Sequence, residues 1–389
     1  MLSYITKLGV GKLGIGAIPF RMRKLWILFL LINSLVKANT WVEVRCFPTS
    51  PYTYCVLEKG RDGGGGFVKF SPDGRLLATA SCSLPCTKIK LWDVSTLRPL
   101  FVFTPSHPMH RASVLDFSPD GKLLVASFFS FGAMSTPTVK VWDTANGQEI
   151  IEIQVGQPTD WVWAAFSQNG KFLAVLAGCT IHVWDTTRWE EIGRLDYPCS
   201  WGGWVGFSSN LLVVNENHTT IKLWDWEKQK EVRRISGDLG FAFAFSPNGQ
   251  IVATGSFEGT IRLWDLSTGE ELQSFPGHNG PITSLAFHPT DFLLASTAKD
   301  STIKLWDLLR NQEILSINYW DLFQLEKPFA ELPTAALAIR VAREITRINA
   351  LAFSPDGTLL ASSLETPGMP TCQGMVHLWY IAGLLSESP

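Results

Sequence analysis

Residues 277–307 read GHNGPITSLAFHPTDFLLASTAKDSTIKLWD, and this stretch contains the pattern that decides the fold. Short runs of β-branched and aromatic residues alternate with Gly, Pro, Asp and Ser, which is typical of strands joined by tight turns. Apolar side chains fall on both faces of the run 282–287, so we expect that strand to be buried between two sheets. Because one small sheet cannot cover both of its faces, the unit is expected to stack on further units.

The same unit occurs seven times. Each copy ends in Trp-Asp or, in the last copy, Trp-Tyr, and the tryptophans are Trp92, Trp142, Trp184, Trp224, Trp264, Trp306 and Trp379. A Phe marker precedes each tryptophan, usually as Phe-Ser-Pro-Asp-Gly or a variant of it, and begins at Phe70, Phe117, Phe166, Phe207, Phe245, Phe287 and Phe353. The two series alternate one to one with a period of about 40 residues, which leaves room for four strands per unit. Seven twisted sheets stacked radially close a ring.

These doubled markers resemble those of the WD-repeat family, and the resemblance covers residues 53–385. It implies an all-β, seven-bladed β-propeller. It also implies a non-enzymatic scaffold, because WD-repeat proteins typically bind partners through loops on the faces of the propeller. We therefore expect a protein or peptide partner, and a monomeric chain.

The two ends of the repeat region predict how the ring closes. Only residues 380–389 follow Trp379, which are too few for a convincing outer strand, whereas segment 53–58 precedes the first Phe marker without a partner. We expect 53–58 to form the outer strand of blade seven and to pair with 374–379, because an unpaired edge is a liability. The alternative is an eighth partial blade or a ragged end. Residues 386–389 would form a short tail.

The family also carries a structural hydrogen-bond network within a blade. It joins a His after Gly, a Ser on the second strand, an Asp in the next turn and the repeat Trp. Only blade six matches this network in full, with His278, Ser296, Asp300 and Trp306. The resemblance implies that these residues stabilise the blade and are not a catalytic His-Asp-Ser set. Elsewhere the His is absent, so we expect packing to dominate the stability of the other blades.

Residues 1–38 show the order of a secretory signal peptide. Basic residues between 21 and 24 precede an apolar run at 25–32, and Ala38 offers a cleavage site. The run is too short for a comfortable membrane span. We therefore expect export to a periplasmic or extracellular location, membrane contact only if the segment stays uncleaved, and a linker over 39–52. The alternative is an apolar tail on a cytoplasmic protein.

Composition and motifs narrow the function further. Apolar residues make up 46% and charged residues 17% of the chain, which fits a globular protein, and a net charge of −2 without a basic stripe argues against nucleic-acid binding. The chain contains no phosphate-binding loop, no His-Glu-x-x-His and no nucleophile elbow. His107 and His110 lack an acidic or cysteine partner at ligand spacing. We expect no catalytic residues, no metal and no cofactor.

The seven cysteines match no zinc module. In an exported chain Cys82 and Cys86, which share one loop, are the first candidates for a disulfide. Buried free thiols are the alternative.

Four long loops are expected on one face of the ring, at 81–88, 129–138, 319–346 and 364–374. The longest, between blades six and seven, includes the segment 334–345, whose composition predicts a short amphipathic helix. We interpret this face as a recognition surface, although loops without a shared ligand are the alternative. Its candidate partner-binding residues are Trp320, Phe323, Leu337 and Val341.

Trp163 and Trp204 are further candidates. They stand on the innermost strands of blades three and four, where Ser284 and Ala350 stand in other blades. Such bulk near the channel favours an aromatic pocket for a peptide or sugar, and core filling is the alternative.

A second class of function stays open at this point. Some exported propellers are enzymes, such as hydrolases or quinone-dependent oxidoreductases, with a site at the channel mouth. The inner strands of this chain show no converging set of acids or metal ligands, so the scaffold is the preferred prediction.

Overall fold

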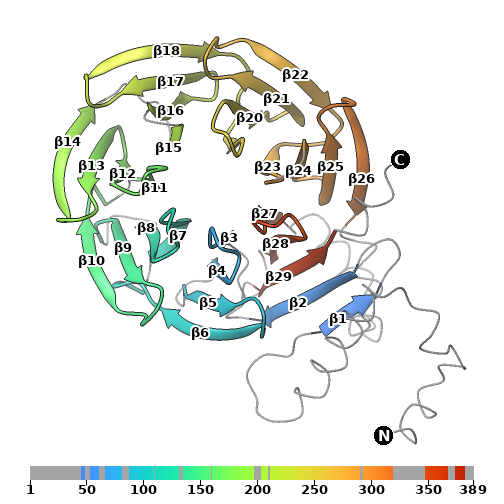
Figure 1. Ribbon diagram of the computed structural model, residues 1–389, viewed down its shortest axis with the longest axis horizontal. Helices are drawn as coiled ribbons and strands as arrows, with labels where there is room; N and C mark the ends of the chain where they lie inside the picture. Colours follow the sequence, from blue (N-terminus) through green and yellow to red (C-terminus); the bar gives the residue numbers. More distant parts are fainter. Residues whose placement is uncertain are drawn as a thin grey trace, which may run out of the picture.

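Seven antiparallel sheets stand around a central axis and form a closed ring (Figure 1). The computed structural model describes residues 45–48, 53–60, 66–80, 87–108, 110–130, 135–158, 160–196, 203–208, 211–289, 292–318, 347–366 and 373–381. All regular elements in these ranges are strands. Within the same ranges, no helix is long and apolar enough to cross a membrane. The all-β, seven-bladed propeller expected from the repeats is confirmed.

Blades one to six each contain four consecutive strands, numbered from the channel outward. Blades one to three consist of β3 (Phe67–Phe70), β4 (Leu76–Ala80), β5 (Ile89–Asp93), β6 (Arg98–Phe103), β7 (His110–Phe117), β8 (Leu123–Ser130), β9 (Thr138–Asp143), β10 (Glu149–Gln154), β11 (Val162–Phe166), β12 (Phe172–Ala177), β13 (Thr180–Asp185) and β14 (Glu190–Asp196). Blades four to six consist of β15 (Val205–Ser208), β16 (Leu211–Asn217), β17 (Thr220–Asp225), β18 (Lys230–Ser236), β19 (Ala242–Phe245), β20 (Ile251–Gly255), β21 (Thr260–Asp265), β22 (Glu271–Pro276), β23 (Ile282–Phe287), β24 (Leu293–Ala298), β25 (Thr302–Asp307) and β26 (Gln312–Asn318).

The seventh blade combines both ends of the chain. Its inner strands are β27 (Arg347–Phe353), β28 (Leu359–Thr366) and β29 (Gln373–Tyr380), and its outer strands are β2 (Thr53–Gly60) and β1 (Arg45–Pro48). Strand β2 runs antiparallel to β29, with Thr53 opposite Tyr380 and Gly60 opposite Gly374. The first and last parts of the described chain therefore share one sheet.

Strand β1 was not expected, because the sequence analysis placed residues 45–48 in a linker. It pairs with β2 and gives this blade a fifth strand. The two prolines of the segment favoured a linker, but Pro48 is the last residue of β1. A proline at the end of an edge strand removes no hydrogen bond that a central ladder needs.

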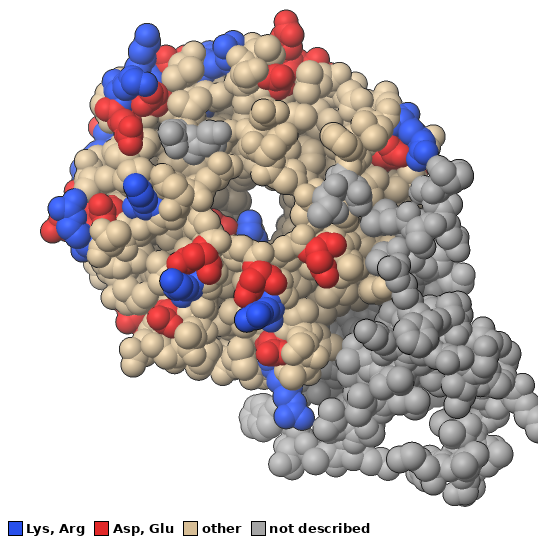
Figure 2. Space-filling model, viewed as in Figure 1, with Lys and Arg blue, Asp and Glu red and all other residues tan. Residues whose placement is uncertain are grey.

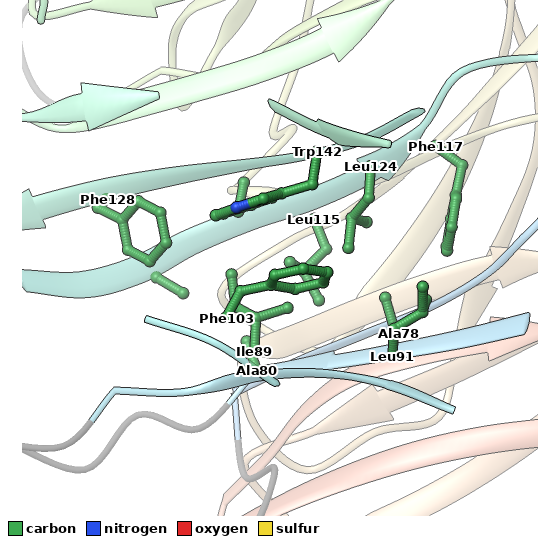
Figure 3. Close-up of a cluster of buried hydrophobic side chains, with 12 residues drawn as sticks. Ala78, Ala80, Ile89, Leu91, Phe103, Leu115, Phe117, Leu124, Phe128 and Trp142 are labelled. Atoms are coloured by element: carbon green, nitrogen blue, oxygen red, sulfur yellow. The ribbon is translucent and has the colours of Figure 1, made fainter. Parts of the chain in front are cut away.

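The hydrophobic core is divided among the junctions between blades. The described buried apolar residues form seven clusters, and each cluster draws its members from two neighbouring blades. Figure 3 shows the cluster between blades one and two, where the rings of Phe103 and Trp142 stack with centroids 4.7 Å apart. Full burial of a large apolar side chain stabilises the fold by about 1.5–3 kcal/mol. Neither blade of a pair can gain this energy alone.

The role of β2 is testable with two truncations. Removal of residues 1–48 takes away only the edge strand β1 and should leave a cooperative ring. Removal of residues 1–60 also takes β2 and exposes the edge of β29, so it should cost far more than the roughly 0.5–3 kcal/mol of a point substitution. Calorimetry of both variants measures the difference. Equal melting temperatures and equal cooperativity would show that β2 does not hold the ring closed.

Candidate functional site

The four residues singled out in blade six lie in one hydrogen-bonded chain. The indole Nε1 of Trp306, on β25, donates to Ser296 Oγ on β24 at 2.8 Å. Ser296 Oγ lies 2.7 Å from His278 Nε2, and His278 Nδ1 lies 3.0 Å from Asp300 Oδ2 in the turn between β24 and β25. Because a carboxylate only accepts, Nδ1 carries the proton and Nε2 accepts from the serine hydroxyl.

Asp300 is held by several donors. Its Oδ2 accepts the backbone N–H of Asn279 at 2.8 Å, and its Oδ1 accepts the hydroxyl of Thr302 at 2.7 Å. Burial acts to raise the pKa of Asp300, but the hydrogen bonds from His278, Thr302 and Asn279 outweigh it and hold the pKa well below its ordinary value of 3.8. Asp300 is therefore ionised at neutral pH.

The hydrogen-bonded residues Ser296, His278 and Asp300 are of the same types as a Ser-His-Asp catalytic set, but a substrate cannot reach them. The side chain of His278 is 0% exposed and Ser296 is 0% exposed. A nucleophile must reach its substrate, and Ser296 already accepts the indole proton of Trp306. The geometry supports a role in holding blade six together.

The other repeat tryptophans divide into two groups. Trp92, Trp264 and Trp379 donate from Nε1 to a hydroxyl on the second strand of their own blade, namely Thr79 at 3.0 Å, Thr254 at 2.9 Å and Ser362 at 2.8 Å. Four blades thus keep this bond, and three of them lack the histidine. The sequence analysis missed these acceptors, which a comparison of the second strands position by position would have found.

Blades two to four carry an apolar residue at the acceptor position, which is Ala126, Val175 and Val214 in turn. The Nε1 atoms of Trp184 and Trp224 are buried and have no hydrogen-bond partner among the described residues. An orphaned buried donor costs about 1–3 kcal/mol. Blades three and four therefore lack a stabilising bond that four other blades have.

The tryptophans proposed to line the channel occupy different environments. Trp204 is 3% exposed and stacks on Phe243 of blade five with centroids 3.6 Å apart, so it fills the core and offers no surface to a partner. Trp163 is partly buried and lies 5.7 Å from Phe243. Of the two expectations for Trp204, the structure favours core filling.

An exposed aromatic cluster lies at the boundary of blades four and five, on the face that carries the turns between second and third strands. We call it the rim cluster, and it consists of His218, Phe241 and Phe257. Phe241 and Phe257 are 42% and 43% exposed. The ring of His218 meets Phe241 and Phe257 edge-on, with centroids 4.1 Å and 5.0 Å away. Sequence analysis missed the cluster because its members come from three separate connections.

The same face carries a second exposed ring. Trp161, which precedes β11 in blade three, is 39% exposed and packs against Phe129 of blade two with centroids 4.2 Å apart. Aromatic surface therefore lies at two separate junctions of this face.

Several expected site residues lie outside the described residues. These are Trp320, Phe323, Leu337 and Val341, together with the helix expected at 334–345. Most of the other three long loops lies outside them as well, including Cys82 and Cys86. Cys179 is described and is disulfide-bonded.

The described residues bring no three His, Cys, Asp or Glu side chains together as a metal site. The rings of His107 and His110 lie 5.5 Å apart, and Nε2 of His110 is within 2.8 Å of Ser135 Oγ. A serine hydroxyl at this distance accounts for one nitrogen of His110 without a metal ion.

Comparison with known proteins agrees with this geometry. The family model for the WD domain, G-beta repeat, matches residues 150–185, 230–265, 269–307 and 343–379. The chain thus carries WD repeats within its seven-bladed β-propeller. The fold of this WD-repeat protein is similar to the crystal structure of RRP9 WD40 repeats, with a TM-score of 0.65 and 18% identity over 86% of this chain and 100% of that chain.

One curated relative of this WD-repeat protein is the periodic tryptophan protein 2 homolog of Dictyostelium discoideum. The two are 27% identical over 149 residues, which is 38% of this chain. The match spans only 15% of the length of that relative.

These similarities overturn the expected export. Similarity to the periodic tryptophan protein 2 homolog and to RRP9 conflicts with the predicted periplasmic or extracellular location, which is wrong. The signal peptide expected at residues 1–38 gains no support from these similarities. A short apolar run after basic residues also occurs in segments that are not exported, and residues 1–38 lie outside the described residues. The run alone could not distinguish these cases.

The network of blade six predicts a pH-dependent effect of Asp300→Asn. The folded-state pKa of Asp300 lies below the ordinary value of 3.8, so its ionised form stabilises the fold above that pH, and this stabilisation is lost as the pH falls below it. At pH 7 the substitution should cost about 1–3 kcal/mol. The cost should shrink in urea unfolding below about pH 4.

Asp73→Asn is the control, because the Asp73 side chain is 55% exposed and lies in a surface turn. It should cost much less at pH 7. An equal cost for both substitutions would contradict the role assigned to the buried network.

The orphaned indole of Trp224 predicts a stabilising substitution. Thr at position 214 would place a hydroxyl where Thr79 stands in blade one, and the indole N–H could donate to it. Val214→Thr should therefore stabilise the protein by about 1 kcal/mol. Val213→Thr, on the opposite face of the same strand, buries a hydroxyl without this donor and should destabilise by a similar or larger amount. Urea unfolding compares the two, and equal effects would refute the assignment.

Proposed function

We propose that this protein is a non-enzymatic scaffold that binds a protein partner on the face carrying the rim cluster. The observation that carries the proposal is the exposure of Phe241 and Phe257, which both have more than two fifths of their surface in solvent. Phenyl rings held in this way offer apolar surface at little cost in side-chain entropy, and aromatic residues are enriched at the centres of protein interfaces.

The cluster is preorganised. His218, Phe241 and Phe257 contact one another edge to face, so each ring restricts the other two. The backbone beneath is also fixed, because the carbonyl of His218 accepts the N–H groups of Leu239 and Gly240 at 2.8 Å and 3.1 Å. A partner that binds here pays little for ordering the surface.

Polar groups border the apolar centre. Arg262 Nη1 contacts Asp238 Oδ2 at 3.3 Å, and Glu258 follows Phe257 directly. An apolar centre with a polar rim is the usual anatomy of a protein interface. The families of the known relatives support binding of a protein partner in general, and the position on this face is our proposal.

Removal of both phenyl rings tests the proposal. The variant Phe241→Gln/Phe257→Gln should fold normally and should lose its partner, because truncation of central interface residues costs about 2 kcal/mol or more, a factor of about 30 in affinity. Crosslinking in cells of the native host, followed by affinity purification and quantitative mass spectrometry, measures the retained partners.

Phe292→Gln is the matched control. Phe292 is 65% exposed and precedes β24 on the opposite face, so its loss removes the same kind of side chain from a different surface. The control should retain every partner of the unmodified protein. Equal partner sets for all three proteins would refute the proposed face.

A further inference from the structure

The turns between first and second strands seal the opposite face of the ring in a regular way. A Cβ added to Gly121 of blade two would lie 3.6 Å from Pro72 of blade one, and one added to Gly170 of blade three would lie 3.5 Å from Pro119 of blade two. Gly74 of blade one meets Pro355 of blade seven in the same manner. In these three pairs the proline of one turn covers the glycine of the next, whereas Gly357 of blade seven meets His288 of blade six.

This seal is missing between blades three and four. Blade three has Gln168 where blades one, two and five have proline. Only two residues separate β15 from β16 in blade four, whereas five separate β3 from β4 in blade one. Blade four therefore has neither the proline nor the glycine of the pattern. A small pocket of about 130 Å³, open to solvent, lies at this junction. It is lined by Ser167, Asn169, Lys171, Phe172, Phe207, Trp226 and Glu227.

The wall of the pocket is aromatic because of one substitution within the repeat. Trp226 follows the Trp-Asp pair of blade four, where blades two and three have Thr144 and Thr186. Those threonines donate to the carbonyls of their own first turns at 2.8 Å and 2.6 Å. Trp226 instead packs edge-on against Phe172 of blade three, with centroids 4.8 Å apart. Its ring leaves one wall of the pocket apolar.

The arrangement of charged side chains at the opening of the pocket also differs from that in blades one and two. In blades one and two the turn carboxylate lies near the following base, with Asp73 and Arg75 at 3.8 Å and Asp120 and Lys122 at 3.5 Å. Figure 2 shows acidic and basic side chains side by side on the lower side of the opening of the central channel. Blade three has Asn169 at the carboxylate position, and Lys171 forms no ion pair with any described residue.

Glu227 at the same mouth does not replace the missing carboxylate, because it forms no ion pair with Lys171 among the described residues. Its charge acts instead on Lys228, whose pKa is raised by the hydrogen bond and charge of Asp225 and, to a smaller extent, by Glu227. Lys171 is the one cation among the residues that line the pocket, and it is not paired with Glu227, the one anion among them.

We propose that the pocket between blades three and four binds an aromatic ring that carries a carboxylate close to it. The ring packs against Trp226 and Phe172, and the carboxylate binds the ammonium group of Lys171. Such a group is found on a peptide with an aromatic residue beside an acidic one and on a free aryl acid. The pocket is on the face opposite the rim cluster and does not depend on the proposed function.

The full-length protein labelled with 5-fluorotryptophan provides the test. The fluorine NMR signal of Trp226 is identified by its absence from the spectrum of Trp226→Phe. This signal is then followed during titration with indole-3-acetate and, separately, with tryptamine. The two probes share the indole ring and differ in charge. Indole-3-acetate should shift this signal in a saturable manner, and tryptamine should bind about tenfold more weakly or not at all. Absence of a saturable shift, or equal binding of the two probes, would overturn the proposal.

Two matched variants test the role of Lys171 without touching the aromatic wall. Asn169→Asp restores the carboxylate that blades one and two have, so it should neutralise Lys171 and weaken indole-3-acetate binding about five- to tenfold. Asn248→Asp makes the same change in the equivalent turn of blade five and should have no effect. Both residues are exposed, and aspartate already occupies this position in three blades, as Asp73, Asp120 and Asp356, so folding is preserved. Equal affinities for the two variants would overturn the assignment of Lys171.

A third probe separates the two sources of the ligand. The peptide acetyl-Gly-Asp-Trp-Gly-amide places a carboxylate beside an indole within a chain. Tighter binding of the peptide than of indole-3-acetate identifies a protein segment as the ligand, whereas tighter binding of the free acid identifies a small aryl acid.

Discussion

The burial of apolar side chains between neighbouring blades is the interaction on which the rest of the structure depends. Each described core cluster belongs to a junction between two blades, so a blade has no complete core of its own. The ring must close, since an open end would leave one apolar face in water. Positions on the rim and at the turns are not subject to this constraint, and the rim cluster and the pocket beside Trp226 occur there.

The irregularities gather in blades three and four. These blades have the orphaned indoles of Trp184 and Trp224, and blade four has the short first turn and the extra ring of Trp226. Blades six and seven keep the tryptophan bond to a serine hydroxyl. Blades three and four lack the tryptophan bond and are held by apolar packing against their neighbours.

The sequence predicted the repeated strands and the residues of the blade-six network, and it missed the rim cluster and the pocket beside Trp226. Seven Trp and Phe markers were enough for the blade count, because each marker occupies the same place in its sheet. The rim cluster was missed because His218, Phe241 and Phe257 share no spacing in the sequence. The pocket beside Trp226 was missed because it arises from an absence, namely the lost proline and glycine of two turns, and only the packing of the other turns gives that absence a meaning.

The sheet of blade seven has a consequence for the synthesis of the protein. Strand β2 leaves the ribosome among the first residues of the ring, and its partner β29 ends at Tyr380, so more than 300 residues separate them. At about 5–20 residues per second, roughly 15–60 s pass between the synthesis of β2 and that of its partner β29. During that time the edge of β2 that pairs with β29 is open, and the apolar face of blade one that packs on blade seven is exposed to solvent. The nascent chain therefore has aggregation-prone surface until its last blade is complete.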